Sequence, residues 1–270
     1  MIQRLEYGEG HPERICCYCG DWADTVDHVP SKVFLDEPYL DNLPVVPCCK
    51  KCNEQFSLDE EYVAELFECV RLQTFTPKQF KREKIRKIVN HNPAILQTVK
   101  ETVHPMLDGH FSMDPENVRL KKVLTKLIAG HLRFEGLDQW FLHDALDICF
   151  YQDVHVNQNF YNRFHSPIFS GMLPEVGSRA LIALVENGYA GSPWFTVQPG
   201  RYEYCVAPDN SEVRIIIQDF FGVRGRKNIN VSSNASRNHP STIVNRPKLT
   251  THDIFLNLTP NEEEARKLYN

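Results

Sequence analysis

Residues 15–22 read ICCYCGDW and residues 47–54 read PCCKKCNE, and these two stretches decide how the N-terminal part of the chain folds. Each stretch carries a C-x2-C pair, and 29 residues separate the two pairs. The paired cysteines are Cys16, Cys19, Cys49 and Cys52. Four thiolates delivered as two close pairs suit a closed tetrahedral Zn²⁺ site that has no open coordination position. The spacing therefore predicts a structural zinc ion bound by these four side chains.

Two further cysteines, Cys17 and Cys48, stand directly beside the pairs and are alternative ligands. Gly20 favours the C-x2-C pair that precedes it, because the residue after the second cysteine of a zinc knuckle often needs a positive φ that glycine tolerates. The same spacing favours Cys49 over Cys48. An iron–sulfur centre and a set of unrelated core cysteines are the competing interpretations.

The composition is that of a globular chain. Its 270 residues are 42% hydrophobic and 24% charged, which excludes the disordered, collagen-like and coiled-coil classes. No apolar run approaches the roughly 20 residues of a membrane helix, and the first ten residues are polar. We therefore expect a cytoplasmic protein without a membrane partner. Nine cysteines, an odd number, argue against a disulfide framework in that reducing compartment.

Beyond the cysteine-rich segment, the apolar pattern predicts a helical body that ends in strands. Helices are predicted at 58–75, 77–89, 120–131, 138–150 and 181–188. Two alternating runs flank the polar residues 208–211 and predict a β-hairpin; residues 222–251 are predicted loops, and a capping box at 259–262 predicts a last helix. The sequence thus indicates an α+β fold, with a zinc-bound module at 1–68 and a substrate- or partner-binding body at 69–270 that carries a C-terminal β-hairpin or small sheet.

The segment between the two cysteine pairs is longer than a simple turn requires, because the corresponding segment of a zinc ribbon usually has only about 15–20 residues. It contains DHVPSK at 27–32 and then Asn42, and Asn53 follows the second pair at once. His28 can act as a general base near neutral pH. Asp27 and Asn53 offer hard oxygen ligands that suit Mg²⁺ or Mn²⁺ rather than zinc. A base that activates water and a cation that neutralises phosphate charge are the requirements of phosphodiester hydrolysis.

The pattern CYCG…DHVPSK…N-L-x-V-V-P-x-C-x-x-C-N…S-x-D-E-E-Y, over about residues 15–62, resembles the HNH endonucleases with a zinc-bound treble-clef frame. In that family two β-strands and a helix, the ββα-metal motif, surround one catalytic metal ion. The last motif position here is Asn53 rather than histidine, a common variant. The resemblance implies that His28 is the general base, that Asn42 braces the loop and fixes the base, and that Asp27 and Asn53 bind the catalytic metal. It also implies cleavage of DNA to 5′-phosphate and 3′-hydroxyl ends.

Each of these residues also has a structural interpretation. Asn53 could cap the helix that follows the second cysteine pair, and Asn42 could be a turn residue before a strand. The alternative function is a zinc treble-clef module that binds nucleic acid or a protein without cleaving. RNA stays open as the substrate, and so does a homodimer or a regulatory protein partner. Stand-alone members of the family serve in restriction, phage defence and mobile elements, and only that analogy suggests phage defence here.

The formal net charge of −5 conceals two opposite parts. Residues 1–68 carry five basic and fifteen acidic side chains, whereas residues 220–252 carry six basic and no acidic ones. Lys32 and the basic residues of a predicted loop at 222–227 are the candidate phosphate contacts, and an ordinary solvated surface is the alternative. These loop residues are Arg224, Arg226 and Lys227.

Overall fold

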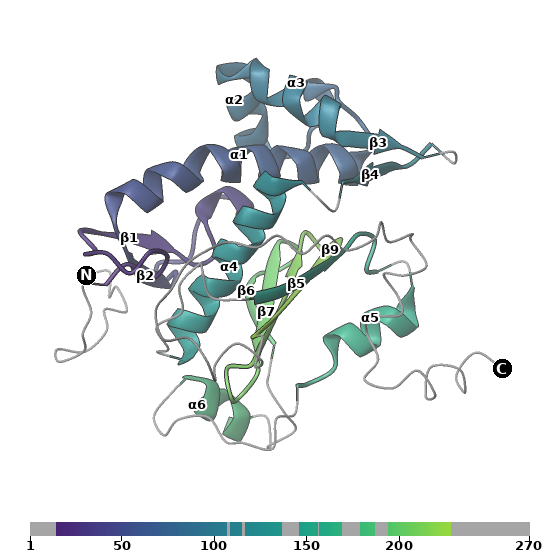
Figure 1. Ribbon diagram of the computed structural model, residues 1–270. Coiled ribbons are helices and arrows are strands. Elements are labelled where there is room, and N and C mark those ends of the chain that lie inside the picture. Colours follow the sequence, from purple (N-terminus) through teal and green to yellow (C-terminus); the bar gives the residue numbers. More distant parts are fainter. Residues whose placement is uncertain are drawn as a thin grey trace. The chain divides into compact units, whose positions relative to one another are not determined.

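The chain contains both helices and antiparallel strands, and the predicted α+β class is confirmed in the computed structural model (Figure 1). The structure describes residues 15–106, 109–114, 117–136, 146–155, 157–168, 179–186 and 194–227. All of them belong to one compact unit, residues 1–229, and a second unit at 230–270 lies outside the described residues. None of the described helices is both long and apolar enough to cross a membrane.

The N-terminal segment consists of a cysteine-bearing turn, two short strands and a long helix. Its elements are β1 (Thr25–His28), the 3-10 helix η1 (Lys32–Phe34), β2 (Val45–Cys48) and α1 (Lys50–Leu72). The two strands are antiparallel, with Asp27 opposite Val46 and His28 opposite Val45. This register places the DHVP stretch at the end of β1, beside the strand that leads into the second cysteine pair.

Helix α1 starts earlier than the apolar pattern indicates. The helical periodicity begins at Leu58, but the helix begins directly after Cys49, which occupies the N-cap and accepts a hydrogen bond on its Sγ atom from the Cys52 amide. The helix also crosses residue 68, where the sequence analysis places the boundary between module and body. Its buried side chains belong to the same apolar cluster as side chains of the sheet. Among them are Leu66, Phe67 and Val70.

Three helices pack on α1 (Figure 1). They are α2 (Glu83–His91), α3 (Pro93–Thr102) and α4 (Val118–Gly136), and a hairpin of β3 (Val103–Pro105) and β4 (Phe111–Met113) separates α3 from α4. The predicted helix at 120–131 is confirmed within α4. The predicted helix at 77–89 is present in part, because a 3-10 turn, η2 (Pro77–Gln79), precedes α2. The sequence pattern does not indicate α3.

A five-stranded antiparallel sheet follows, with the strand order β5-β9-β8-β7-β6. Its strands are β5 (Leu146–Tyr151), β6 (Phe195–Gln198), β7 (Tyr202–Val206), β8 (Glu212–Ile217) and β9 (Phe221–Lys227). The predicted hairpin around 208–211 is confirmed as β7 and β8. Helix α4 contacts four of the strands, and Gly225 permits this, because a Cβ atom there would lie 2.5 Å from Ile128 Cδ1. The other described helices are α5 (Gln158–His165) and α6 (Arg179–Glu186), and α6 confirms the helix predicted from residue 181.

Two predictions about this region are wrong. Residues 146–150, expected at the end of the helix predicted at 138–150, lie in β5, where the apolar residues at 146, 148 and 150 follow the period of two that a strand requires. Residues 138–145 of that prediction lie outside the described residues. Residues 222–227, expected in a loop, form β9. Gly222 suggests a loop in the sequence, but it makes room for packing, since a Cβ atom there would lie 2.7 Å from Val154 Cγ1. The rest of the predicted loop and the capping box at 259–262 lie outside the described residues.

Candidate functional site

Four cysteine thiols gather at the N-terminal end of α1, and we call them the cysteine quartet. Its members are Cys16, Cys19, Cys49 and Cys52, and their Sγ atoms lie within 4.8 Å of one another. The Sγ atoms of Cys19 and Cys49 are 3.7 Å apart. In a tetrahedron of sulfur atoms about 2.3 Å from zinc, the edge is about 3.8 Å. The predicted cluster is thus confirmed, and its donor set and size fit a structural zinc ion.

The first cysteine pair lies in a tight turn. The Gly20 amide donates to the Cys16 carbonyl at 3.0 Å, and Gly20 has a φ of 81°, as the sequence analysis expects. The neighbouring Cys17 points elsewhere: its thiol is buried and lies 3.7 Å from the Ala129 carbonyl of α4. Similarly, the Cys48 thiol donates to the Cys49 carbonyl at 3.3 Å. Cys17 and Cys48 are therefore core residues beside the quartet.

Protonation of the quartet makes its metal binding pH-dependent. The side-chain interaction with Cys48 lowers the pKa of the Cys16 thiol, which favours its thiolate form. Burial raises the pKa of the Cys19 thiol to about 11, so a bound metal has to displace that proton. Since zinc binds thiolates, we expect the affinity of the quartet for zinc to fall as the pH falls.

Asp27 lies on the buried face of β1, and both of its close partners share one carboxylate oxygen. The Tyr18 hydroxyl donates to Asp27 Oδ2 at 2.6 Å, and Lys126 Nζ of α4 lies 2.6 Å from the same atom. The Asp27 side chain is 9% exposed and that of Lys126 is 2% exposed. The charge of Asp27 is thus balanced inside the protein by an ammonium group from another part of the chain.

Lys126 joins a wider group that we call the Lys126 cluster, made of Tyr18, Asp27, Ser31, Glu60 and Lys126. The ammonium group donates to Ser31 Oγ at 2.7 Å and forms an ion pair with Glu60, and Ser31 in turn donates to Glu60 Oε1 at 2.6 Å. Burial raises the pKa of the Glu60 carboxyl. Burial also disfavours a charged Lys126, but the Asp27 and Glu60 carboxylates outweigh this and raise its pKa. The cluster links the DHVPS stretch, α1 and α4.

Lys126 is a site residue that the sequence does not predict. A local signal exists, since Lys126 is a single lysine within the apolar run VLTKLIAG of α4, but such a residue usually extends to solvent. Its burial results from the close approach of α4 to the DHVP stretch. Gly130 permits this approach, because a Cβ atom there would lie 2.9 Å from Val29 Cγ2 and 3.6 Å from the Tyr18 hydroxyl.

The other motif residues lie around the end of β1. His28 is the last residue of the strand and is half-buried, on the face opposite Asp27, because side chains alternate along a strand. Asn53 lies in the first turn of α1, with its Nδ2 atom 3.5 Å from the Val26 carbonyl of β1. Asn42 lies in an exposed turn before β2. The structure thus places Asn53 beside β1, and the neighbouring Asp27 and His28 point to opposite faces of that strand.

The oxygen donors at this end of β1 suit a hard cation. In the part of the chain that the structure describes, Asp27 Oδ1 accepts no hydrogen bond, whereas Oδ2 has two partners. Asn53 adds an amide oxygen at the start of α1. Mg²⁺ and Mn²⁺ bind through one or two such protein oxygens and keep several water molecules. By donor type, Asp27 and Asn53 are therefore the residues that would hold a divalent cation of this kind, separate from the cysteine quartet.

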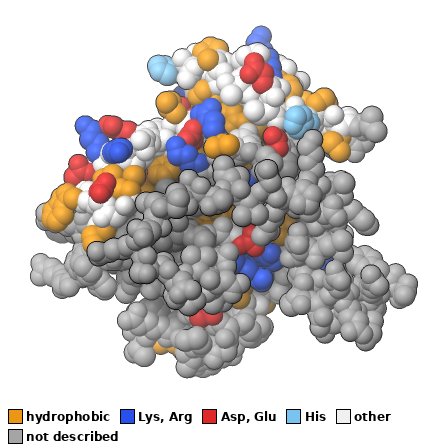
Figure 2. Space-filling view, viewed as in Figure 1, with side chains coloured by type: hydrophobic (Ala, Val, Ile, Leu, Met, Phe, Trp, Pro, Cys, Tyr) orange, Lys and Arg blue, Asp and Glu red, His pale blue; other side chains and the backbone are white. Residues whose placement is uncertain are grey.

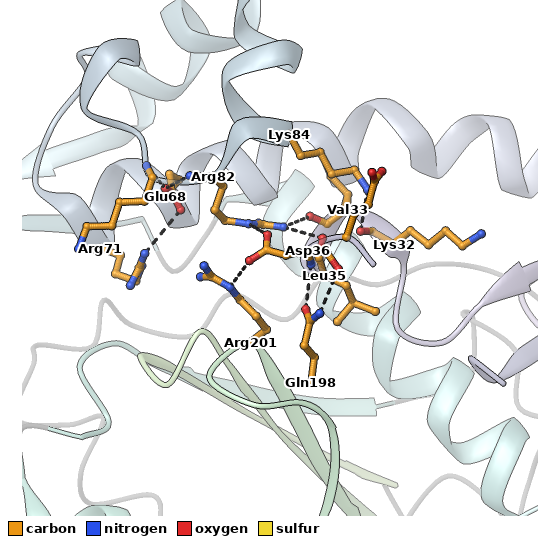
Figure 3. Close-up of polar contacts among 12 residues, drawn as sticks. Lys32, Val33, Leu35, Asp36, Glu68, Arg71, Arg82, Lys84, Gln198 and Arg201 are labelled. Atoms are coloured by element: carbon orange, nitrogen blue, oxygen red, sulfur yellow. Dashed lines mark hydrogen bonds and ion pairs between the residues drawn. The ribbon is translucent and has the colours of Figure 1, made fainter. Parts of the chain in front are cut away.

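The loop between β1 and β2, which carries Lys32 and Asn42, is anchored by Asp36 (Figure 3). The Asp36 carboxylate pairs with Arg82 at 2.8 Å and with Arg201, and the Gln198 amide exchanges two hydrogen bonds with the Asp36 backbone. Burial opposes ionisation of Asp36, but the two guanidinium groups outweigh it and lower the pKa of this carboxyl. Arg82, at the N-cap of α2, and Gln198 and Arg201, from the β6–β7 hairpin, thus hold the loop.

The candidate phosphate contacts differ in accessibility. Lys32 is exposed at the start of η1. Arg224 is only 7% exposed within the sheet, so it does not present its charge to solvent as the predicted loop would. Arg226 is half-exposed and forms an ion pair with Glu212. Lys227 ends β9, and its side chain is outside the described set.

Acidic side chains accompany the basic ones on the surface over α1 to α3 (Figure 2). On α1, Lys50 lies 3.8 Å from Glu54, and on α2, Lys87 lies 2.9 Å from Glu83. Residues 77–89 carry six basic side chains and one acidic side chain, Glu83. The ion pair with Lys87 neutralises part of this positive charge, and Arg82 in the same stretch is buried.

No protein-family model, no curated protein and no solved structure matches this chain. Its function is therefore inferred from its residues and their contacts.

Proposed function

We propose that this chain is a metal-dependent endonuclease of the HNH type that hydrolyses DNA phosphodiester bonds. The arrangement that supports this proposal is the position of His28, Asp27 and Asn53 at one end of β1, beside the cysteine quartet. The order of elements, a cysteine-bearing turn, two antiparallel strands and a helix, is that expected of a ββα-metal motif on a treble-clef frame. A phosphodiesterase needs a base and hard oxygen ligands within one short segment, and this segment supplies both.

In this proposal each residue has a separate task. His28 takes a proton from the attacking water, since an imidazole is a competent base near neutral pH. Asp27 and Asn53 hold Mg²⁺ or Mn²⁺, which when bound neutralises charge on the phosphate and on the leaving oxygen. Asn42 braces the loop that precedes β2. The cysteine quartet holds zinc as a structural ion, and the products carry 5′-phosphate and 3′-hydroxyl ends.

The remaining residues would hold or select the substrate. Lys32 and Arg226 are the exposed cations among the candidate phosphate contacts described above. The role in restriction or phage defence rests on analogy with stand-alone nucleases of this type.

A specific observation favours a second candidate, a zinc module that binds nucleic acid or a protein without cleaving it. Lys126 already balances the charge of Asp27, so the folded chain does not need a divalent cation at this position for its stability. A module of this kind would keep the cysteine quartet and would bind its partner equally well with and without added Mg²⁺.

The two candidates are separated by incubating the zinc-loaded protein with supercoiled plasmid. We expect nicking and linearisation in Mg²⁺ or Mn²⁺ and none when the zinc-loaded protein receives no other divalent cation. Ligation of the nicks by DNA ligase without prior phosphorylation would verify the 5′-phosphate and 3′-hydroxyl ends. Binding of labelled DNA without any cleavage in either metal would favour the second candidate.

Arg226 offers a test of the phosphate contacts. If it binds a phosphate, Arg226→Gln is expected to weaken DNA binding and to reduce the slope of log K against log salt by about one. The matched control is Arg214→Gln, because Arg214 pairs with the same Glu212 but is only 14% exposed. Titrations of labelled DNA at several salt concentrations give both slopes. An unchanged slope in Arg226→Gln would remove this residue from the interface.

A further inference from the structure

The two oxygens of the Asp27 carboxylate are used unequally. Oδ2 accepts a hydrogen bond from Tyr18 and an ion pair from Lys126, both at 2.6 Å. Oδ1 accepts no hydrogen bond from the described residues. Because Oδ2 is held from two sides inside the protein, the orientation of the whole carboxylate is fixed, and Oδ1 is the atom left for an additional cation.

Lys126 has little freedom to leave this position. An ammonium group has three donors, and Lys126 has three polar partners, Asp27 Oδ2, Ser31 Oγ and Glu60 Oε1. Its Nζ atom also lies 5.5 Å and 5.7 Å from the ring centroids of Phe56 and Tyr18. A buried charge this well satisfied is part of the folded structure rather than a mobile surface group.

Without the ammonium group, the electrostatics of the site would change in two ways. Asp27 and Glu60, both bound to Lys126 Nζ, would become an uncompensated acidic pair able to attract a divalent cation between them. Such a cation would sit between the two carboxylates and not at Oδ1 of Asp27. The positive charge of Lys126 opposes both effects, because it repels a second cation and occupies the space between the carboxylates.

We propose that Lys126 is a positioning residue for the catalytic metal: it holds Oδ2 of Asp27, leaves Oδ1 for the divalent cation, and keeps the affinity for that cation low. This inference rests on the proposed endonuclease function. It assigns to a residue of α4, far along the chain from the motif, control over the metal affinity of the motif.

The test is Mn²⁺ binding to the zinc-loaded protein, followed by the electron paramagnetic resonance signal of free Mn²⁺. Lys126→Met alone leaves Asp27 and Glu60 buried without compensation and can prevent folding. The informative comparison is therefore Lys126→Met/Glu60→Gln, in which one positive and one negative charge are removed together, against Glu60→Gln alone. Circular dichroism and zinc content are measured to check that both variants are folded.

We expect the double variant to bind Mn²⁺ at least about tenfold more tightly than Glu60→Gln, because the repulsion by Lys126 is gone. Asp27→Asn should lose this binding, and Lys126→Arg, which keeps the charge, should stay close to wild type. A purely structural role of Lys126 would lower the melting temperature without changing Mn²⁺ affinity.

Equal Mn²⁺ affinities of the double variant and Glu60→Gln would overturn the inference, and so would the absence of Mn²⁺ binding in both. Failure of the endonuclease proposal looks different: wild type would not nick plasmid DNA although the Mn²⁺ affinities change as expected. In that case Lys126 controls a cation site that does not serve cleavage.

Discussion

His28→Ala is expected to lower the rate of plasmid cleavage by about 10²- to 10⁴-fold, the usual contribution of a positioned general base. The fold should tolerate the change. His28 is the last residue of β1, and its backbone pairing with Val45 does not depend on the side chain. Its side chain lies on the face of the strand opposite the Lys126 cluster, so the buried ion pairs stay in place.

The measurement is a time course of supercoiled plasmid in Mn²⁺, together with zinc content and thermal unfolding of both proteins. His165→Ala is the matched control, because His165 is also half-exposed and pairs with Glu203, but belongs to α5 and lies outside the proposed site. It should cleave at the wild-type rate. If His28→Ala cleaves as fast as wild type, His28 is not the base and the endonuclease proposal fails.

Short-range chemistry explains what the sequence predicts correctly. The cysteine quartet follows from ligand spacing, since each C-x2-C pair closes its turn within a few residues. The positive φ of Gly20 follows from the same turn. The hairpin of β7 and β8 follows from two alternating runs around a polar turn, where pairing partners are neighbours in sequence.

Contacts between distant segments explain what the sequence does not reveal. Lys126 looks like a surface lysine until α4 packs against the DHVP stretch through Gly130. Arg82 looks like part of a basic helix, but it binds Asp36 and the Val33 and Leu35 carbonyls. In both cases a charged side chain is buried because its partners come from another element, and no local period encodes that pairing.

The wrong predictions for β5 and β9 also result from contacts between distant segments. β9 contains glycines that are typical of loops, yet these positions are needed because α4 and neighbouring side chains approach the strand closely. β5 pairs with β9, about 75 residues later in the chain, so its strand state depends on a partner that the local pattern does not identify.

Cys16→Ser and Cys52→Ser are expected to lose bound zinc and to unfold the N-terminal segment. Structural zinc contributes about 10–16 kcal/mol of binding free energy in zinc-finger peptides, which is comparable with the whole unfolding free energy of a typical protein, about 5–15 kcal/mol. The small apolar cluster around the quartet cannot replace that energy, because cysteines themselves make up half of its ten buried residues. Since β1 is part of this segment, cleavage should be lost together with zinc.

Cys17→Ser is the matched control, because Cys17 is adjacent to Cys16 and equally buried but lies outside the quartet. A serine hydroxyl can still donate to the Ala129 carbonyl, so the variant should keep its zinc and lose at most about 1–3 kcal/mol of stability. The ligand variants and the Cys17→Ser control are compared by metal analysis of the purified proteins and by thermal unfolding with and without a chelator. Full zinc content in Cys16→Ser, together with zinc loss in Cys17→Ser, would show that Cys17 and not Cys16 is a zinc ligand. If every single variant retained its zinc, the segment would fold through its apolar contacts. The stability of β1 would then not depend on the metal content of the protein.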